Sequence, residues 1–263
     1  MEIKIVFKTA RSVTLETVTE QIYEFEKPGK ILVNGNVYGE TKRVVFTLFD
    51  LKPDMDYNIS LERNGERAEA SFHTDYEFVT LNVKDMGARG DGIQDDTSFI
   101  QAAVMACPKD SRVLIPKGKY RITSLFLKSH LRLELAEGAE LLADTDRNKY
   151  PRFPGMIESY DEKEDYNLGT WEGNPLPMFA GIITGIDVED AVVYGSGLIN
   201  GQASFDNWWD NVRRMKVAFR PRMVFLERCK NVTLQGFSLK KQPCLGASSI
   251  FQPGLKIPQS GCL

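Results

Sequence analysis

The chain has 263 residues, of which 42% are hydrophobic and 26% charged, and its formal net charge is −3. That length suits one large domain accompanied by a small one. Lysine and arginine are scattered among the carboxylates, so no basic face is indicated and nucleic acid is excluded as a partner. The two histidines and four cysteines, without CxxC spacing, suggest neither a zinc site nor a disulfide framework, and we assign no metal and no cofactor.

The N-terminal residues Met-Glu-Ile-Lys-Ile-Val-Phe-Lys include no apolar stretch of signal-peptide length. No later segment approaches the length of a membrane span. These two features predict a cytoplasmic protein with no membrane partner.

Residues 1–76 read as a small all-β sandwich, because short alternating apolar runs are separated by turn dipeptides such as Asn34-Gly35. Residues 51–61 resemble the stretch of fibronectin type III domains in which a tyrosine hydroxyl pins a corner before a strand. Tyr57 is the candidate corner residue. The resemblance implies a spacer or packing module over residues 1–76.

Residues 87–106 combine a glycine-rich turn with a short amphipathic helix. Gly87, Gly90 and Gly92 allow the positive φ values of a tight turn. Either Asp95 or Asp96 can accept hydrogen bonds from the free N–H groups at the start of the helix. The helix carries one apolar stripe, which must pack on a larger apolar surface. The stripe comprises Phe99, Ile100, Ala103, Val104 and Cys107.

The phrase Gly-Asp-Gly-x-x-Asp-Asp-Thr at residues 90–97, followed by an Ile-Gln-Ala helix, resembles the opening segment of the pectate-lyase-like superfamily. The resemblance implies a right-handed parallel β-helix whose open end the helix covers. It identifies a fold and no chemistry, so we interpret the polar residues as turn and cap residues. An EF-hand calcium loop does not fit, because Asp96 and Ala102 stand where it needs Gly and Glu. The turn and cap residues are Gly90, Asp91, Gly92, Asp95 and Asp96.

From residue 78 onward, short apolar bursts recur at irregular intervals without a helical period. Residues 190–195 and 231–236 carry the same phrase, and 231 − 190 = 41 positions separate them. Stacked coils produce such an echo, because each coil buries its inward residues only against its neighbours. The segments between the bursts are too short and polar for the helices of a βα alternation. The fold class predicted is therefore all-β, an incomplete β-helix over residues 77–240 after an N-terminal sandwich.

Four stretches within residues 78–240 resemble glycoside hydrolase family 28, the polygalacturonase family. They are residues 115–120, residues 194–202, the pair Trp208-Trp209, and residues 220–232, which begin Arg-Pro. The resemblance implies that Trp208 and Trp209 stack on sugar rings, although buried packing is an open alternative for at least one of them. It also implies that Arg220 faces a uronate carboxylate, with a structural salt bridge as the alternative.

Residues 150–177 are too long and polar for a plain turn and are interpreted as a long loop. In bacterial members of the resembled family, insertions here wall off one end of the cleft and favour exo-action. The resemblance therefore implies an oligogalacturonide or a related pectic oligosaccharide as the partner.

Hydrolysis with inversion needs a protonated carboxyl and a carboxylate about 6.5–9.5 Å apart. The resemblance implies that Asn-Thr-Asp and Gly-Asp-Asp motifs supply them, followed by Gly-His-Gly and Arg-Ile-Lys, and none of the four motifs occurs in this sequence. We assign no catalytic residue and predict that the 263-residue chain is inactive and poorly stable, because an uncapped coil exposes an apolar end.

After Lys240 the family pattern expects Asn-Ser-Pro-x-Trp, whereas the chain reads Lys-Gln-Pro-Cys-Leu-Gly. Removing one A from an A-run across the codons of Lys240 and Lys241 restores the expected phrase with permitted codons. Our hypothesis is that residues 241–263 are an out-of-frame tail. An authentic C-terminal segment is the alternative.

Two other functions fit the same fold. A polysaccharide lyase would need a calcium-binding carboxylate cluster or a basic residue in later coils, and the Trp pair argues against it. A non-catalytic, glycan-binding β-helix of tailspike type is the other, and the fibronectin-like module disfavours it.

Overall fold

The computed structural model describes residues 1–158, 166–171, 174–210, 219–244 and 247–250. It divides into two compact units, the first formed by Met1–Val79 and the second beginning at Thr80. Each unit has its own hydrophobic core. We describe the two units separately.

The first unit contains two antiparallel sheets. One has the order β1-β2-β5 and the other β4-β3-β6-β7. Apolar residues of both sheets form one core, as Leu15 and Phe46 from the first and Ile31 and Ile59 from the second illustrate. The strands are β1 (Glu2–Lys8), β2 (Val13–Val18), β3 (Glu24–Val33), β4 (Asn36–Arg43), β5 (Val45–Leu48), β6 (Asp56–Arg63) and β7 (Glu66–His73).

Tyr57, on β6, makes the kind of contact that its neighbours in the sequence suggested. Its ring is buried and stacks on Phe72, and its hydroxyl accepts a hydrogen bond from the Lys52 backbone N–H at 2.8 Å. The contact joins the start of β6 to the segment before it.

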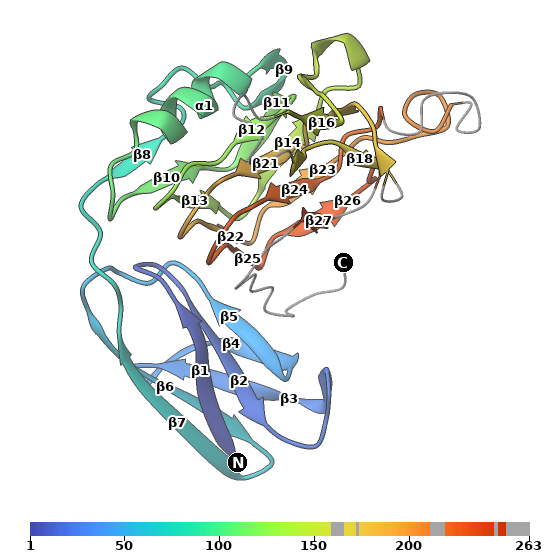
Figure 1. The fold of residues 1–263 in the computed structure, drawn as a ribbon. Coiled ribbons are helices and arrows are strands. Elements are labelled where there is room, and N and C mark those ends of the chain that lie inside the picture. The colour runs from blue at the N-terminus through green and yellow to red at the C-terminus, as the bar shows by residue number, and fades with distance from the viewer. Residues whose placement is uncertain (159–165, 172–173, 211–218, 245–246, 251–263) are drawn as a thin grey trace. The chain divides into compact units, whose positions relative to one another are not determined.

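The second unit is built of three parallel sheets, and the chain visits them in turn in each coil (Figure 1). Consecutive strands in every sheet are parallel neighbours. The first sheet consists of β8 (Thr80–Asn82), β10 (Arg112–Ile115), β13 (Arg132–Leu135), β22 (Val192–Gly195) and β25 (Thr233–Gln235). The second consists of β9 (Asp91–Asp95), β11 (Gly118–Ile122), β14 (Ala139–Ala143), β23 (Leu198–Asn200) and β26 (Ser238–Lys240). The third consists of β12 (Leu125–Phe126), β21 (Ile183–Ile186), β24 (Val224–Glu227) and β27 (Ala247–Ile250).

The phrase repeated in residues 190–195 and 231–236 corresponds to two strands that stack in neighbouring coils. Val192 of β22 pairs with Thr233 of β25, and 233 − 192 = 41, the spacing of the repeated phrase. The fold class predicted from the sequence, a parallel β-helix with an N-terminal antiparallel β unit, is confirmed.

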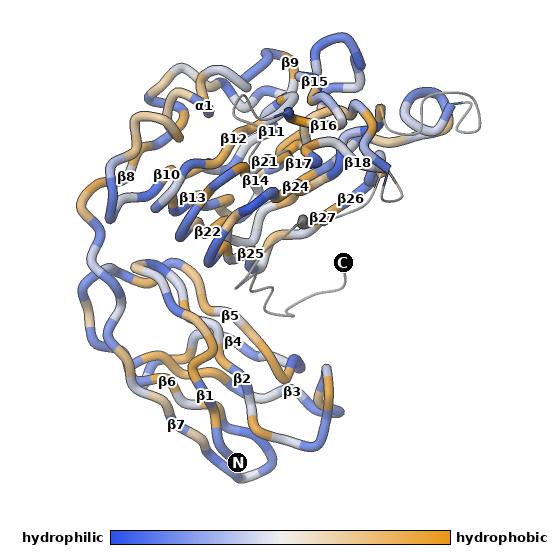
Figure 2. The backbone as a smooth tube through the Cα atoms, viewed as in Figure 1, coloured by the Kyte–Doolittle hydropathy of each residue, from blue (hydrophilic) through white to orange (hydrophobic). Residues whose placement is uncertain are grey.

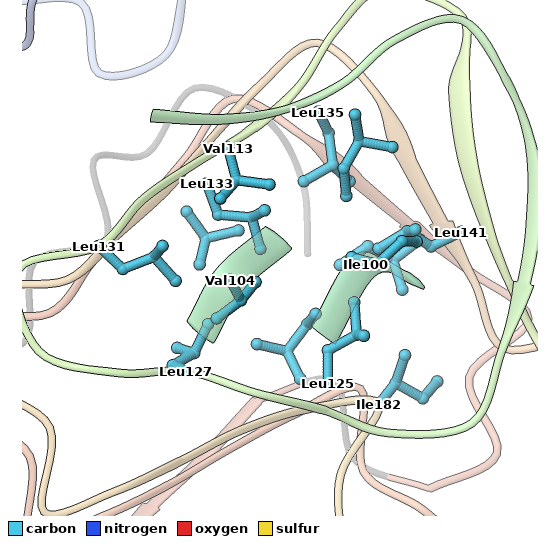
Figure 3. Close-up of a cluster of buried hydrophobic side chains, with 14 of the residues drawn as sticks. Ile100, Val104, Val113, Leu125, Leu127, Leu131, Leu133, Leu135, Leu141 and Ile182 are labelled. Atoms are coloured by element: carbon cyan, nitrogen blue, oxygen red, sulfur yellow. The ribbon is translucent and has the colours of Figure 1, made fainter. Parts of the chain in front are cut away.

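Inward-facing residues of the first sheet form an aliphatic column. Leu81, Val113, Leu133, Val193 and Leu234 pair one above the next from β8 to β25. Figure 3 shows the leucine side chains of one coil pointing into this interior, and Figure 2 shows apolar and polar residues alternating along the strands. Each such burial contributes about 1.5–3 kcal/mol, so the coils hold together mainly through this column.

The helix α1 (Thr97–Ala106) packs on the interior of the coils, as its apolar stripe required. Ile100 and Val104 are fully buried in the same cluster as the column residues (Figure 3). The other helical element among the described residues is the short 3₁₀ helix η1 (Arg147–Lys149).

The two aspartates before α1 have different partners. Asp95 Oδ1 accepts the Thr97 N–H at 3.0 Å, so this side chain bonds to the first residue of the helix. Asp96 makes no cap hydrogen bond to the helix. Its carboxylate is buried and accepts the N–H groups of Arg89 at 2.9 Å and Gly90 at 3.0 Å. Asp96 therefore stabilises the turn before the helix. The sequence alone could not decide between this role and capping of the helix.

The turn itself uses positive-φ backbone at three glycines, Gly87 with φ +103°, Gly90 with φ +65° and Gly92 with φ +77°. Asp91 Oδ1 accepts the N–H groups of Ile93 at 2.8 Å and Gln94 at 2.9 Å. A Cβ on Gly90 would lie 2.8 Å from the ring of the buried Tyr120, so glycine is also needed there for close approach.

The described parts of residues 150–177 contain short strands, whereas the sequence indicated a long loop. Three short antiparallel strand pairs lie in and next to this segment, and they are too short to show alternation in the sequence. They are β15 (Arg152–Phe153) with β20 (Met178–Phe179), β16 (Met156–Ile157) with β17 (Tyr166–Asn167), and β18 (Thr170–Trp171) with β19 (Asn174–Pro175).

The segment after Lys240 is described in part. Residues 247–250 form β27, which pairs in parallel with β24. Residues 245–246 and 251–263, which include most of the proposed out-of-frame tail, lie outside the described residues. In the part of the chain that the structure describes, no helix is both long and apolar enough to cross a membrane.

Candidate functional site

Two excursions of the chain leave the coils and pack together. One connects β14 to β21 and the other connects β23 to β24. Their described parts contribute four aromatic rings, whose contacting pairs have centroids 5.2–6.4 Å apart. This aromatic cluster consists of Tyr150, Phe179, Trp208 and Phe219.

Trp208 lies inside the aromatic cluster, with an exposed fraction of 1%. Its ring meets Tyr150 edge-on at 5.5 Å and Phe179 at 6.4 Å. Tyr150 is also buried, and its hydroxyl donates to the Asp144 carbonyl at 2.8 Å. For Trp208 the sequence left open stacking on a sugar or buried packing. The geometry favours packing, because a ring that is 1% exposed has no free face for a sugar.

Arg147 and Arg152 lie against the rings of the aromatic cluster. The guanidinium carbon of Arg147 is 4.6 Å from the Trp208 ring centroid, and that of Arg152 is 5.2 Å from the Phe219 centroid. Arg147 also donates to the Phe219 carbonyl at 2.6 Å. Cation–π contacts of this kind contribute about 0.5–2 kcal/mol each, depending on exposure.

Arg220 completes what we call the arginine cluster, which consists of Arg147, Arg152 and Arg220. Arg220 is half-buried. Burial, followed by the positive charge of Arg220, lowers the pKa of Arg147, while Asp210 opposes the shift. Arginine side chains whose positive charges act on one another favour the binding of an anion.

Two of these arginines form no salt bridge with the carboxylates that the structure describes, although Asp210 adds negative charge near Arg147. Salt bridges tie other arginines, such as Arg132 to Asp190 at 2.9 Å, but none involves Arg147 or Arg152 within the described ranges. An external carboxylate can therefore approach the exposed Arg152 without displacing a described partner.

Trp209 is half-buried and packs against the aromatic cluster. Its indole N–H donates to the Pro243 carbonyl at 3.3 Å, and its ring centroid lies 5.4 Å from that of Phe205. Of the residues that the sequence singled out, Trp209 and Arg220 therefore remain partly accessible, whereas Trp208 supports them from within.

Sequence reasoning did not single out Arg147 or Arg152. Both lie in a polar stretch with no apolar period, and they reach the aromatic cluster only because η1 and β15 bring them there. Their aromatic neighbours are 61 and 67 positions away in the sequence (208 − 147 = 61 and 219 − 152 = 67). Local sequence carries no signal for contacts of that range.

The outward face of the third sheet carries a buried carboxyl group, Glu227, next to apolar packing. Phe225 packs there against Leu168 and Met178 of the first excursion. Alternation along β24 places Glu227 on the same face as Phe225. Glu227 is 1% exposed, and its burial raises its pKa to about 7, with Arg228 opposing and Asp187 adding to the shift.

Within the described residues, no group of three or more His, Cys, Asp or Glu side chains is placed to hold a metal ion. The turn aspartates Asp91, Asp95 and Asp96 instead bond to backbone N–H groups.

Comparison with known proteins gives sequence and structural matches. The model of a family described as rhamnogalacturonase A/epimerase, pectate lyase-like, matches residues 80–133. An exo-poly-alpha-D-galacturonosidase of Dickeya chrysanthemi is 41% identical over 71 residues, which cover 27% of this chain and 12% of that protein.

Among solved structures, the chain is similar to a family 28 exopolygalacturonase of Yersinia enterocolitica, with a TM-score of 0.68 and 20% identity over 97% of this chain and 59% of that one. It is also similar to a hyperthermoactive exopolygalacturonase of Thermotoga maritima, with a TM-score of 0.52 and 19% identity over 69% of this chain and 47% of that one. The chain thus spans only part of each of these proteins. At such identities the structural likeness shows the fold, which is that of a pectate lyase-like β-helix with polygalacturonases among its structural neighbours.

Proposed function

We propose that this chain provides substrate-binding coils of a polygalacturonase-type glycoside hydrolase and that its arginine cluster binds the carboxylate of a galacturonide unit. The observation that carries the proposal is the placement of Arg147 and Arg152 against aromatic rings, without a carboxylate salt bridge in the described ranges. Guanidinium groups bind carboxylates in a bidentate manner, and the partly exposed ring of Trp209, beside the aromatic cluster, suits the apolar face of a sugar ring. An acidic pectic oligosaccharide presents both features.

The reaction that we propose for the complete enzyme is hydrolysis of galacturonide linkages with inversion, by exo-action. The names of the two exopolygalacturonases and of the Dickeya protein support it.

We further propose that the 263-residue chain binds the oligosaccharide without hydrolysing it. The four motifs that the family resemblance assigns to catalysis do not occur in the sequence. Binding and hydrolysis are therefore tested by separate experiments.

Binding is tested by calorimetric titration of the chain with trigalacturonate and with its neutral, fully methyl-esterified form. We expect the acid to bind at least tenfold more tightly than the ester at low salt, with a difference that shrinks as salt rises. Arg152→Ala should reduce the preference for the acid, whereas Arg67→Ala, on an exposed strand of the first unit, should leave it unchanged. Equal affinity for acid and ester would remove the basis of the proposal.

Hydrolysis is tested by incubating the chain, and the full-length product of a restored reading frame, with oligogalacturonides. New reducing ends without absorbance of an unsaturated product identify a hydrolase, and that absorbance identifies a lyase. We expect reducing ends from the longer product only. If the 263-residue chain releases them itself, the catalytic groups lie within it and our assignment is wrong.

A further inference from the structure

Phe205 is the most exposed of the large apolar side chains in the described residues, with an exposed fraction of 79%. Its ring does not stand alone. It meets the Trp209 ring at 5.4 Å between centroids and an interplanar angle of 67°, an edge-to-face contact. The two rings form an accessible aromatic pair at the surface of the second excursion, which we call the aromatic platform.

The turn that carries the aromatic platform is held by hydrogen bonds at both ends. Asn207 Oδ1 accepts the Ser204 N–H at 2.8 Å, and Asn207 Nδ2 donates to the Gln202 carbonyl at 3.0 Å. The Trp209 N–H donates to the Ser204 carbonyl at 3.1 Å. A surface ring on such a turn is ordered before any ligand arrives, so a ligand loses less entropy in binding to it.

The arginine cluster supports the same turn. Arg147 donates to the carbonyls of Asn207 at 3.1 Å and Trp208 at 3.2 Å, while its guanidinium covers the Trp208 ring. The aromatic platform and the arginine cluster are thus joined through one residue, Arg147. A ligand carboxylate at the arginines and a ligand ring at the platform belong to neighbouring parts of one molecule.

We propose that the aromatic platform of Phe205 and Trp209 is a stacking subsite for a pyranose ring adjoining the galacturonide whose carboxylate lies at the arginine cluster. This inference rests on the proposed function and adds the subsite and its ligand chemistry. In a galacto-configured ring the axial O4 leaves the C–H groups of C3, C4 and C5 together on one face. That apolar face matches an aromatic ring, and its burial on Phe205 removes exposed apolar surface from water.

Charged groups on the turn define how the ring binds. Asp206 and Asp210 are both exposed and belong to the same turn as Phe205 and Trp209. Carboxylate oxygens repel another carboxylate and accept hydrogen bonds from sugar hydroxyls, so we expect the ring's own carboxylate to point away from them. The platform is therefore assigned to the sugar's C–H face and hydroxyls, and the arginines are assigned to the charge.

The test uses the complete 263-residue chain and two probes, trigalacturonate and its fully methyl-esterified form. Phe205→Ala removes an exposed ring, so we expect the fold to be unaffected, as circular dichroism and the melting temperature would show. We expect it to weaken binding of both probes about fivefold to twentyfold, because stacking acts on the ring and not on the charge. Phe205→Tyr keeps an aromatic face and should restore affinity to within about twofold.

Arg152→Ala separates this inference from the proposed function, because it should weaken the acid alone. If acid and ester bind equally while Phe205→Ala weakens both, the proposed function fails and the platform stands. If Phe205→Ala and Phe205→Tyr both bind like the original chain, the platform is not a subsite, whatever Arg152→Ala does. A loss in Phe205→Tyr equal to that in Phe205→Ala would also overturn the inference, since stacking would then not be the cause.

Discussion

The Arg147 guanidinium carbon lies 4.6 Å from the centroid of the Trp208 ring, and the same group donates to the backbone carbonyl of Trp208 at 3.2 Å. One cation thus covers the ring and fixes the backbone of a buried tryptophan. The contact joins the two excursions, because Arg147 belongs to the first and Trp208 to the second.

Replacing Arg147 by alanine should therefore destabilise the second unit. The variant loses a cation–π contact and charge-assisted bonds to three carbonyls, so we expect a loss of about 2–4 kcal/mol in the free energy of unfolding. Denaturant titration measures it. Arg152→Ala, on an exposed residue that contacts the Phe179 and Phe219 rings and forms no salt bridge within the described ranges, is the matched control and should cost less than about 1 kcal/mol. Equal losses in the two variants would show that the carbonyl bonds of Arg147 contribute nothing.

Asp96→Ala should be among the most damaging single changes in the opening turn. The substitution leaves the N–H groups of Arg89 and Gly90 without their buried acceptor, which costs about 2–4 kcal/mol. Asp91→Ala, which removes an exposed acceptor of two N–H groups that water can replace, should cost clearly less. Thermal unfolding of the two variants tests the difference, and a larger loss for Asp91→Ala would contradict it.

Glu227 should make the stability of the chain fall as pH rises. Burial raises its pKa in the folded state to about 7, from an ordinary value of 4.5. Between these values the native state holds a proton that the unfolded state has released, so stability is full below about pH 4.5 and is lost as pH rises through about 7. The loss amounts to at most about 3 kcal/mol.

Unfolding of the original chain and of Glu227→Gln, followed from pH 5 to pH 8, measures this effect. The glutamine variant cannot ionise, so its profile over that interval should be flatter by the contribution of this residue. Glu137→Gln, on an exposed position, serves as the control and should follow the original profile. Parallel profiles for the original chain and Glu227→Gln would show that the carboxyl does not titrate in this interval.

The nucleotide sequence of the gene tests the hypothesis on residues 241–263. We expect a run of A across the codons of Lys240 and Lys241, and one fewer A should open a frame that begins Asn-Ser-Pro-x-Trp. Codons that do not form such a run would refute the hypothesis and favour an authentic C-terminal segment.

Much of the β-helix could be predicted from the sequence, because its determinants are local or periodic. The positive φ of Gly90 and Gly92 belongs to a turn that those glycines permit, and the apolar stripe of α1 is fixed by helical spacing. The phrase repeated after 41 positions appears in the structure as the pairing of Val192 with Thr233. Stacked coils repeat the same burial pattern, so the spacing of the repeat in the sequence predicts which residues of neighbouring coils pair.

The candidate site was decided by the tertiary structure. Trp208 and Arg220 stand out in the sequence, but only the packing of the two excursions shows that Trp208 is buried and that Arg147 and Arg152 join Arg220. The hydrogen-bond partners of Asp96 likewise depend on the folded turn, which brings the N–H groups of Arg89 and Gly90 to its carboxylate. Short-range patterns record which face of a strand or helix is apolar, whereas the meeting of side chains some 60 residues apart (208 − 147 = 61) depends on how whole coils and excursions pack.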